Sequence, residues 1–195
     1  MSYLTEEEIL SIQDNVRLLS ISDIDDISHF SFDSEIEEYN DFLKIAKTFY
    51  DLNISKTFLL FYKKTNELLA YMTLSADSIK LTGDEKEKHD ISKVPYASIP
   101  AVKVGKLAVN KKLSDEAKRK GYGSFMLEMA RAIAFEMNNL GVACRFITVD
   151  ADDEYNPNTH LFYEKNGFVE NLKNRRRNQT TVSMRKDIFI DGEEK

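Results

Sequence analysis

The sequence predicts an α/β fold: a mixed, mostly antiparallel sheet with one parallel strand pair, flanked by helices. Two observations carry this prediction. The strand-like runs 57–62 and 68–74 are joined by a short polar connection, which is typical of an antiparallel hairpin. The apolar runs 102–109 and 142–149 flank a long amphipathic segment, and a strand–helix–strand unit of this kind places its strands parallel.

The N-terminal part is expected to alternate helix and strand. Thr5 and Glu8 have the spacing of a capping box that opens a short helix, and 16–21 has the composition of a strand. After an acidic, irregular stretch, Ser34 and Glu37 repeat the capping-box spacing. Apolar and aromatic residues then recur at helical intervals, which predicts a helix packed on the core.

The C-terminal part follows the strand–helix–strand pattern. The polar segment 77–97 is predicted to be a mobile surface loop. Gly105, inside the next strand, predicts a bulge or the close approach of another backbone. The helix over 124–140 should end at Gly141, since glycine is favoured just after a helix. A short helix should begin near residues 156–159, 180–184 should be the last strand, and the arginines at 175–177 predict a solvated turn.

The composition is that of one globular domain. The chain has 195 residues, 42% of them hydrophobic and 31% charged, so residues 1–195 are expected to share one core. We expect a helix within 1–15 and a frayed tail over 188–195. A net charge of −6 and a pI of about 5.2 argue against a nucleic-acid or anionic membrane surface.

The cysteine and histidine content bears on the compartment of the protein and on metal binding. Cys144 is the only cysteine, so no internal disulfide can form, and a cytoplasmic location is expected. No apolar run is long enough to span a bilayer, and the acidic N-terminus is unlike a signal peptide, so we expect no membrane association. The three histidines are scattered, and we expect no metal site. The sequence does not determine the oligomeric state, although a homodimer fits the base rate for soluble proteins.

The stretch Lys118-Arg119-Lys120-Gly121-Tyr122-Gly123-Ser124 lies between a predicted strand and a predicted helix. That order points backbone N–H groups and the positive end of a helix dipole at one place, and the glycines allow an anion to approach closely. The stretch therefore indicates a phosphate or pyrophosphate site. The alternative is an ordinary tight loop with solvated cations. No Gly-Lys-Ser/Thr follows, and Met126 replaces the third glycine of a dinucleotide fingerprint.

Two motifs carry a resemblance to a known family. The first, over 118–123, stands where that family has Gln/Arg-x-x-Gly-x-Gly/Ala, with lysine as a departure at the first position. The second, over 156–168, matches Asn-x-x-small-x-x-x-Tyr followed by Glu-Lys-x-Gly-Phe, with Thr159 at the small position and Tyr163 at the tyrosine. On these residues, the segment 103–184 resembles the GCN5-related N-acetyltransferases.

The resemblance implies acetyl-CoA as cosubstrate, an amine as acceptor and no metal. Backbone N–H groups of 120–124 would hold the pyrophosphate, and the strand ending at Val109 would pair with the pantetheine arm and supply an oxyanion donor from Leu107 or Val109. Tyr163 would protonate the departing thiolate, unless it is a core aromatic beside Phe162 and Phe168. The implied cofactor-binding residues are Leu107, Ala108, Val109, Lys118, Arg119, Lys120, Gly121, Tyr122, Gly123, Ser124, Asn156 and Thr159. The acceptor and the general base are not identified by the sequence.

The N-terminal half is loosely similar to a bacterial branch of stand-alone acetyltransferases related to toxins that acetylate aminoacyl-tRNA. The similar residues are Phe32-Asp33, 37–44 and 99–101, whereas the Cys-Gly usual after Phe-Asp is replaced by Ser34-Glu35. The acidic pI disfavours tRNA as a partner. A tRNA-directed toxin and a non-catalytic acyl-CoA-binding module are therefore kept as alternatives to a general amine acetyltransferase.

Overall fold

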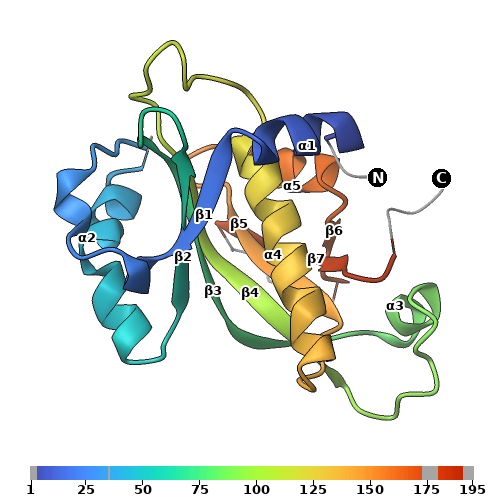
Figure 1. Ribbon diagram of the computed structural model, residues 1–195. Coiled ribbons are helices and arrows are strands. Elements are labelled where there is room, and N and C mark those ends of the chain that lie inside the picture. The colour runs from blue at the N-terminus through green and yellow to red at the C-terminus, as the bar shows by residue number, and fades with distance from the viewer. Residues whose placement is uncertain (1–3, 35, 173–179, 191–195) are drawn as a thin grey trace. The chain divides into compact units, whose positions relative to one another are not determined.

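The computed structural model describes residues 4–34, 36–172 and 180–190. Figure 1 labels most of its helices and strands. In chain order, the elements are α1 (Glu6–Gln13), β1 (Val16–Ser20), the 3-10 turns η1 (Ile21–Asp23) and η2 (Ile27–His29), α2 (Glu37–Asp51), β2 (Lys56–Tyr62), β3 (Leu68–Lys80), α3 (Gly83–Lys88), β4 (Ser98–Val109), α4 (Tyr122–Asn139), β5 (Phe146–Asp152), α5 (Thr159–Lys165), β6 (Val169–Glu170) and β7 (Thr181–Asp187).

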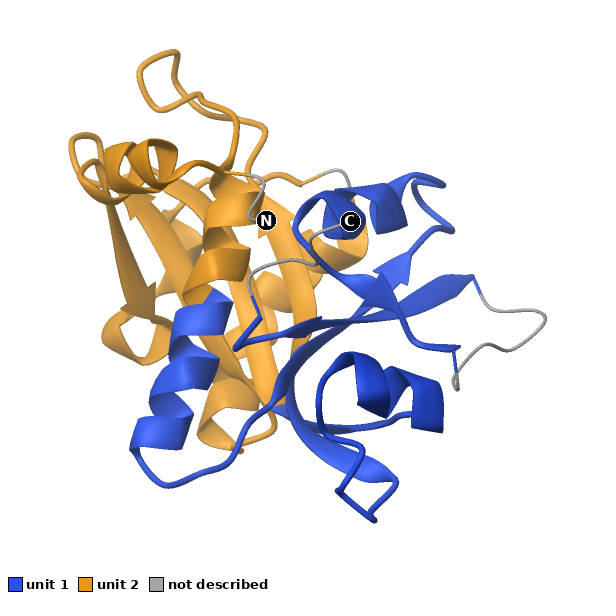
Figure 2. Ribbon diagram, turned by 90° about the vertical axis from the view of Figure 1, so that its right-hand side faces the viewer, with its two compact units in different colours: residues 1–3, 76–103, 130–195 blue, residues 4–75, 104–129 orange. Residues whose placement is uncertain are grey.

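The chain divides into two compact units, which Figure 2 colours separately. Unit 1 comprises Met1–Tyr3, Ala76–Lys103 and Ala130–Lys195, and unit 2 comprises Leu4–Ser75 and Val104–Met129. The strands β3 and β4 and the helix α4 have residues in both units. The assignment of the whole chain to a single domain stays a prediction.

The strands form one hydrogen-bonded sheet with the order β1-β2-β3-β4-β5-β7-β6. β2 and β3 pair antiparallel, as their short connection predicts, and so do β5 and β7. β4 and β5 run parallel, with Ala101 opposite Phe146 and Lys103 opposite Thr148. The prediction of a mixed, mostly antiparallel sheet with one parallel pair and flanking helices is therefore confirmed.

In unit 2, α2 packs its predicted apolar face on the sheet. Leu43 and Ala46 are buried in one cluster with Leu59 and Tyr71 from β2 and β3. The predicted capping box of this helix is wrong. The helix begins after Ile36, which makes no side-chain cap, and the backbone N–H of Ser34 instead donates to the Asn40 side chain at 2.8 Å.

In unit 1, the segment 77–97 is more ordered than its polar composition predicts. β3 continues to Lys80, and a true capping box of Thr82 and Glu85 opens α3. The buried carboxylate of Glu85 accepts hydrogen bonds from Arg185 Nη1 at 2.7 Å and from the Leu172 N–H at 3.2 Å. Tertiary ion pairing therefore fixes a segment that we predicted to be a mobile loop.

His89, just after α3, extends this cluster. Its Nε2 accepts from Arg185 Nε at 3.2 Å, so Nδ1 carries the proton and donates to Asp187 Oδ2 at 3.0 Å. Arg145 donates to the same Asp187 oxygen at 2.7 Å and to the His89 carbonyl at 2.9 Å. These five residues (Glu85, His89, Arg145, Arg185 and Asp187) form what we call the buried ionic cluster of unit 1.

Acid should weaken unit 1 through this cluster. Burial alone would raise the pKa of Asp187, but hydrogen bonds from His89, the Phe189 N–H and Arg145 hold it below its ordinary 3.8. Burial opposes likewise at Glu85, whose pKa the Thr82 and Leu172 N–H groups and Arg185 hold below 4.5. Because both folded pKa values are depressed, the stabilisation is complete above the unfolded values and is lost as pH falls below them.

The measurement is urea unfolding at a series of pH values from about 7 to about 3. We expect the free energy of unfolding to fall below pH about 4.5, and the fall to be shallower in Glu85→Gln. A wild-type unfolding free energy that stays constant through this range contradicts the prediction.

Several boundaries differ from the sequence expectations. β5 begins at Phe146 rather than near Val142, which is 56% exposed. α4 ends at Asn139, one residue before the expected end at Leu140, which is 77% exposed. Ile188, placed at the start of a frayed tail, is buried, and its N–H donates to the Arg145 carbonyl. The arginines at 175–177 and the end of the tail, 191–195, lie outside the described residues.

No helix within the described ranges is long and apolar enough to cross a membrane.

Candidate functional site

The C-terminal half of β4 is the first part of the candidate site. Its parallel register with β5 covers Ala101–Lys103, whereas β4 continues to Val109. Within unit 2, the strand order β1-β2-β3-β4 places β4 at one edge. An outermost strand offers N–H and C=O groups along its edge to an extended ligand. Leu107, Ala108 and Val109, which were predicted to bind pantetheine, lie on this stretch.

Gly105 sits just before these residues. A Cβ at Gly105 would lie 3.0 Å from Thr73 Oγ1, and the same hydroxyl accepts from the Lys106 N–H at 2.9 Å. The predicted close approach is therefore present, although a side-chain hydroxyl makes it rather than another backbone. The contact fixes β4 against β3 immediately before the candidate binding stretch.

A pocket of about 330 Å³ opens at the end of β4. It brings together all three predicted pantetheine-binding residues with the segment that leads into α2. Its lining residues are Ser34, Ile36, Tyr39, Leu107, Ala108, Val109 and Lys111. The opposite wall is formed by Ser34, Ile36 and Tyr39, about 70 residues before the end of β4, and no local motif marks these residues as pocket lining.

Lys106 holds that opposite wall in place. Its ammonium lies 2.6 Å from Glu38 Oε1, 4.5 Å from the ring centre of Tyr39 and 5.4 Å from that of Phe42. The Tyr39 carbonyl also accepts the buried hydroxyl of Tyr71 at 2.8 Å. Burial, followed by the nearby Tyr39 and Glu38, raises the pKa of Tyr71 far above its usual range, so this hydroxyl stays a donor. Sequence analysis identified neither Lys106 nor Tyr39 as a site residue, although a lysine inside the mostly apolar strand β4 was a visible signal.

Asn110 anchors the chain where β4 ends and the basic connector begins. The residue is 4% exposed, and its side-chain amide donates to the carbonyls of Ser31 at 2.9 Å and Leu68 at 2.8 Å. Its Oδ1 accepts from the N–H groups of Asp33 at 3.1 Å and Lys112 at 3.0 Å. Asn110 therefore positions both the segment 31–34, which ends at the pocket residue Ser34, and the start of the connector.

The connector ends in the predicted anion loop. Lys118, Arg119 and Lys120 are exposed. Arg119 Nη1 donates to Ser11 Oγ at 3.4 Å. Gly121 has φ +100°, a left-handed conformation that glycine adopts without strain. A Cβ there would also meet Leu4 Cδ2 at 3.1 Å. Both the left-handed backbone conformation and the close packing of Leu4 therefore require a glycine at position 121.

α4 begins directly after this turn. Its first intrahelical bond runs from the Phe125 N–H to the Gly121 carbonyl at 2.8 Å, so the N–H groups of residues 122–124 precede the helical ladder. Gly121 and Gly123 are partly exposed, whereas Tyr122 and Ser124 are buried. The loop therefore opens to solvent at its two glycines.

Tyr122 has a structural side chain. Its hydroxyl donates to the Ala117 carbonyl at 2.6 Å, and burial raises its pKa to about 12. The ring thus closes the connector from inside, and only the main chain of Tyr122 remains a candidate ligand contact. The role predicted for Tyr122 in cofactor binding uses its backbone N–H, and that role stays a prediction.

The remaining predicted residues lie in unit 1. Asn156 accepts through its carbonyl from the Thr159 N–H at 2.9 Å and from the Thr159 hydroxyl at 2.8 Å, which forms the turn into α5. Tyr163 is 9% exposed and packs edge-on against Phe162 and Phe168, with ring centres 5.1 and 5.5 Å away. Its packing fits the core-aromatic alternative, and its catalytic role stays a prediction.

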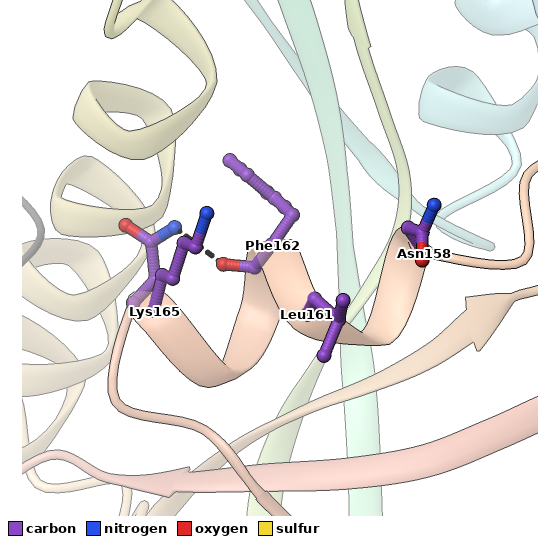
Figure 3. Close-up of a pocket in the computed structure, with 5 residues that line it drawn as sticks. Asn158, Leu161, Phe162 and Lys165 are labelled. Carbon is purple, nitrogen blue, oxygen red and sulfur yellow. Dashed lines mark hydrogen bonds between the residues drawn. The ribbon is translucent and has the colours of Figure 1, made fainter.

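α5 also lines a second pocket, of about 490 Å³, shown in Figure 3. Its lining residues are Asn158, Leu161, Phe162, Lys165 and Asn166. The Asn166 amide donates to the Phe162 carbonyl at 2.8 Å, drawn as a dashed line, while its buried Oδ1 has no partner among the described residues. One residue that lines this pocket therefore carries a buried acceptor without a partner in the described part of the chain.

The acidic residues at the end of β5 and directly after it supply no obvious base. Asp150 forms an ion pair with Lys103, and Asp152 accepts the Glu154 N–H at 3.0 Å. Asp153 binds both His160 Nδ1 at 2.7 Å and the His160 N–H at 3.2 Å, so it caps the first turn of α5. Sequence analysis found no partner for His160, because Asp153 lies in a loop whose shape the sequence does not predict. Across the described ranges, no three His, Cys, Asp or Glu side chains gather as metal ligands would.

Several solved structures have a similar fold. A tyrosine-to-phenylalanine mutant of KacT aligns with a TM-score of 0.65 at 23% identity, over 87% of this chain and 94% of that one. AtaTR bound with acetyl-CoA aligns with a TM-score of 0.66 at 22% identity, over 90% and 95%. AtaT complexed with acetyl-methionyl-tRNAfMet aligns with a TM-score of 0.64 at 21% identity, over 87% and 94%. No protein-family model and no curated protein matches the chain.

Proposed function

We propose, for a chain that has the fold of the GCN5-related N-acetyltransferases, that it transfers an acetyl group from acetyl-CoA to an amine. One observation carries the proposal. The edge strand β4 of unit 2 ends in a pocket at Leu107–Val109. It leads through a basic connector to a glycine turn at the N-terminus of α4. An extended pantetheine arm with a diphosphate at its end needs these features in this order.

The glycine loop would hold the diphosphate. The N–H groups at the start of α4 precede the helical ladder, and the helix dipole favours negative charge there. Lys118, Arg119 and Lys120 add exposed positive charge beside the loop. The main chain of β4 over 107–109 would pair with the amides of the pantetheine arm, which delivers the thioester to the pocket.

The reaction is direct aminolysis of the thioester. The acceptor nitrogen attacks the carbonyl carbon, a main-chain N–H of Leu107 or Val109 stabilises the oxyanion, and the C–S bond breaks. The thiolate then takes a proton, for which we propose the hydroxyl of Tyr163. A thiol pKa of roughly 8.5 and a tyrosine pKa of about 10 are close enough for this transfer. The amine loses its own proton to water or to a base that remains to be identified.

Two measurements test the proposal. Acetyl-CoA should raise the unfolding temperature of the protein, since a ligand that binds only the folded state stabilises it. Release of free CoA should then depend on an added amine. Binding without release from any amine would favour a non-catalytic acyl-CoA-binding module. The absence of any thermal shift at millimolar acetyl-CoA would remove the proposal.

Tyr163→Phe should lower kcat by about a hundredfold and leave acetyl-CoA binding unchanged, because general acid catalysis typically contributes roughly 10²–10⁴. The readouts are CoA release and the acetyl-CoA thermal shift. Tyr155→Phe, at a tyrosine that is 57% exposed, is the matched control and should behave as wild type. Equal kcat in Tyr163→Phe and wild type would return Tyr163 to a purely packing role.

The second candidate function is acetylation of aminoacyl-tRNA by a toxin. It is favoured by the fold shared with AtaT, which was solved in complex with acetyl-methionyl-tRNAfMet. It is opposed by the net charge of −6, although the connector 111–120 is locally basic. Expression should then arrest growth, and Tyr163→Phe should relieve the arrest. Normal growth during expression of the wild type would count against this candidate.

A further inference from the structure

We propose that the pocket beside Tyr39 receives an apolar side chain carried by the acceptor amine, with Tyr39 as the residue that sets its size. The inference rests on the proposed acetyl transfer, since it assumes that the thioester is delivered to Leu107–Val109. It adds the substrate class: an α-amine on a carbon that bears an apolar side chain.

The lining of the pocket supports an apolar occupant. Four of its seven lining residues, Ile36, Leu107, Ala108 and Val109, are aliphatic, and Tyr39 adds an aromatic residue. The Ser34 hydroxyl lies 2.9 Å from the Ile36 carbonyl and 2.8 Å from Asn40 Oδ1, so its proton has partners already. A side chain that cannot hydrogen-bond loses nothing in such a place, whereas a polar one is poorly compensated.

The size and charge of the pocket further restrict which acceptor side chains it can hold. Its volume of about 330 Å³ lies at the lower end of the range for small-molecule sites, which is about 300–1,000 Å³. It therefore suits a group as large as an amino-acid side chain. In the described part of the chain, the one ionised side chain lining it is that of Lys111, so a cationic acceptor side chain would meet like charge.

Tyr39 is held rigidly enough to discriminate by size. Its carbonyl is fixed by the Tyr71 hydroxyl, and its ring faces the Lys106 ammonium, which Glu38 holds in turn. Side chains locked by such contacts keep the shape of a site and thereby its selectivity. Tyr50 is a natural comparison, since it lies on the same helix under the Lys56 ammonium, at 3.9 Å, but away from the pocket lining.

The test measures kcat/KM for CoA release with glycinamide, L-leucinamide, L-phenylalaninamide and L-lysinamide, and in a second arm with the same amino acids esterified to tRNA. In at least one arm, leucine should exceed glycine and lysine by about tenfold or more, the discrimination expected of an apolar pocket. Tyr39→Leu should raise the phenylalanine-to-leucine ratio of kcat/KM by about tenfold, because it enlarges the pocket. Tyr50→Leu should leave this ratio unchanged. The ratio is taken within each variant, so partial loss of folded protein does not affect it.

Three outcomes would overturn the inference. They are equal kcat/KM for glycine and leucine in both arms, a preference for lysine, and an equal change of the ratio in Tyr39→Leu and Tyr50→Leu. Release of no CoA in either arm, with the acetyl-CoA thermal shift intact, would also overturn it while leaving the cofactor site standing. Failure of the proposed function is recognised separately, by the absence of that shift.

Discussion

Gly123→Glu should abolish acetyl-CoA binding while the protein remains folded. Gly123 lies in the first turn of α4, partly exposed, and its φ is not in the left-handed region, so a side chain strains no backbone there. The new carboxylate would occupy the place proposed for the diphosphate and repel it. A negative charge in the first helical turn is otherwise favourable, so the free energy of unfolding without ligand should change little.

The measurement is the acetyl-CoA thermal shift. For the wild type, ligand at about a hundred times its dissociation constant adds about 2.7 kcal/mol, or a shift of about 5–10 °C for a chain of this length. Gly123→Glu should show none. Gly83→Glu is the matched control, because Gly83 also opens a helix and an added Cβ would meet nothing within 4 Å. Equal thermal shifts in both variants would place the diphosphate elsewhere.

Much of the fold was predictable because its signals are local. The hairpin of β2 and β3 follows from a short polar connection, and the parallel pair of β4 and β5 follows from the helix between them. Gly141, predicted to end α4, has φ +87° and lies two residues after Asn139, the last residue of the helix. Patterns in adjacent segments of the chain therefore predicted these two strand pairs.

The rest was not predictable because its causes are distant in sequence. α3 was missed because its polar sequence resembles a loop, and the contacts that order it join Glu85 to Arg185 and His89 to Asp187. The candidate site divides in the same way. Leu107–Val109 follow from a motif, whereas Tyr39 enters the pocket through packing of α2 on the sheet, for which the sequence carries no motif.

Arg185→Met should lower the free energy of unfolding by about 3–5 kcal/mol, the usual cost of removing one partner from a buried ion pair. Arg185 and Glu85 are each about 3% exposed in their side chains, so neither charge is screened by water. Arg185→Met leaves the Glu85 carboxylate without its charged partner and removes the donor to His89 Nε2. Urea unfolding followed by circular dichroism measures the change.

The double variant Glu85→Leu/Arg185→Met separates ion pairing from packing. Because it leaves no unpaired charge between these positions, it should be more stable than Arg185→Met alone, although Glu85 also caps α3 and that contribution is lost. Lys44→Met breaks an ion pair with Asp41 whose side chains are 72% and 62% exposed, so the free energy of unfolding should hardly change. If Arg185→Met costs as little as Lys44→Met, then ordinary apolar packing, rather than the buried ionic cluster, must hold the polar segment 77–97 in place.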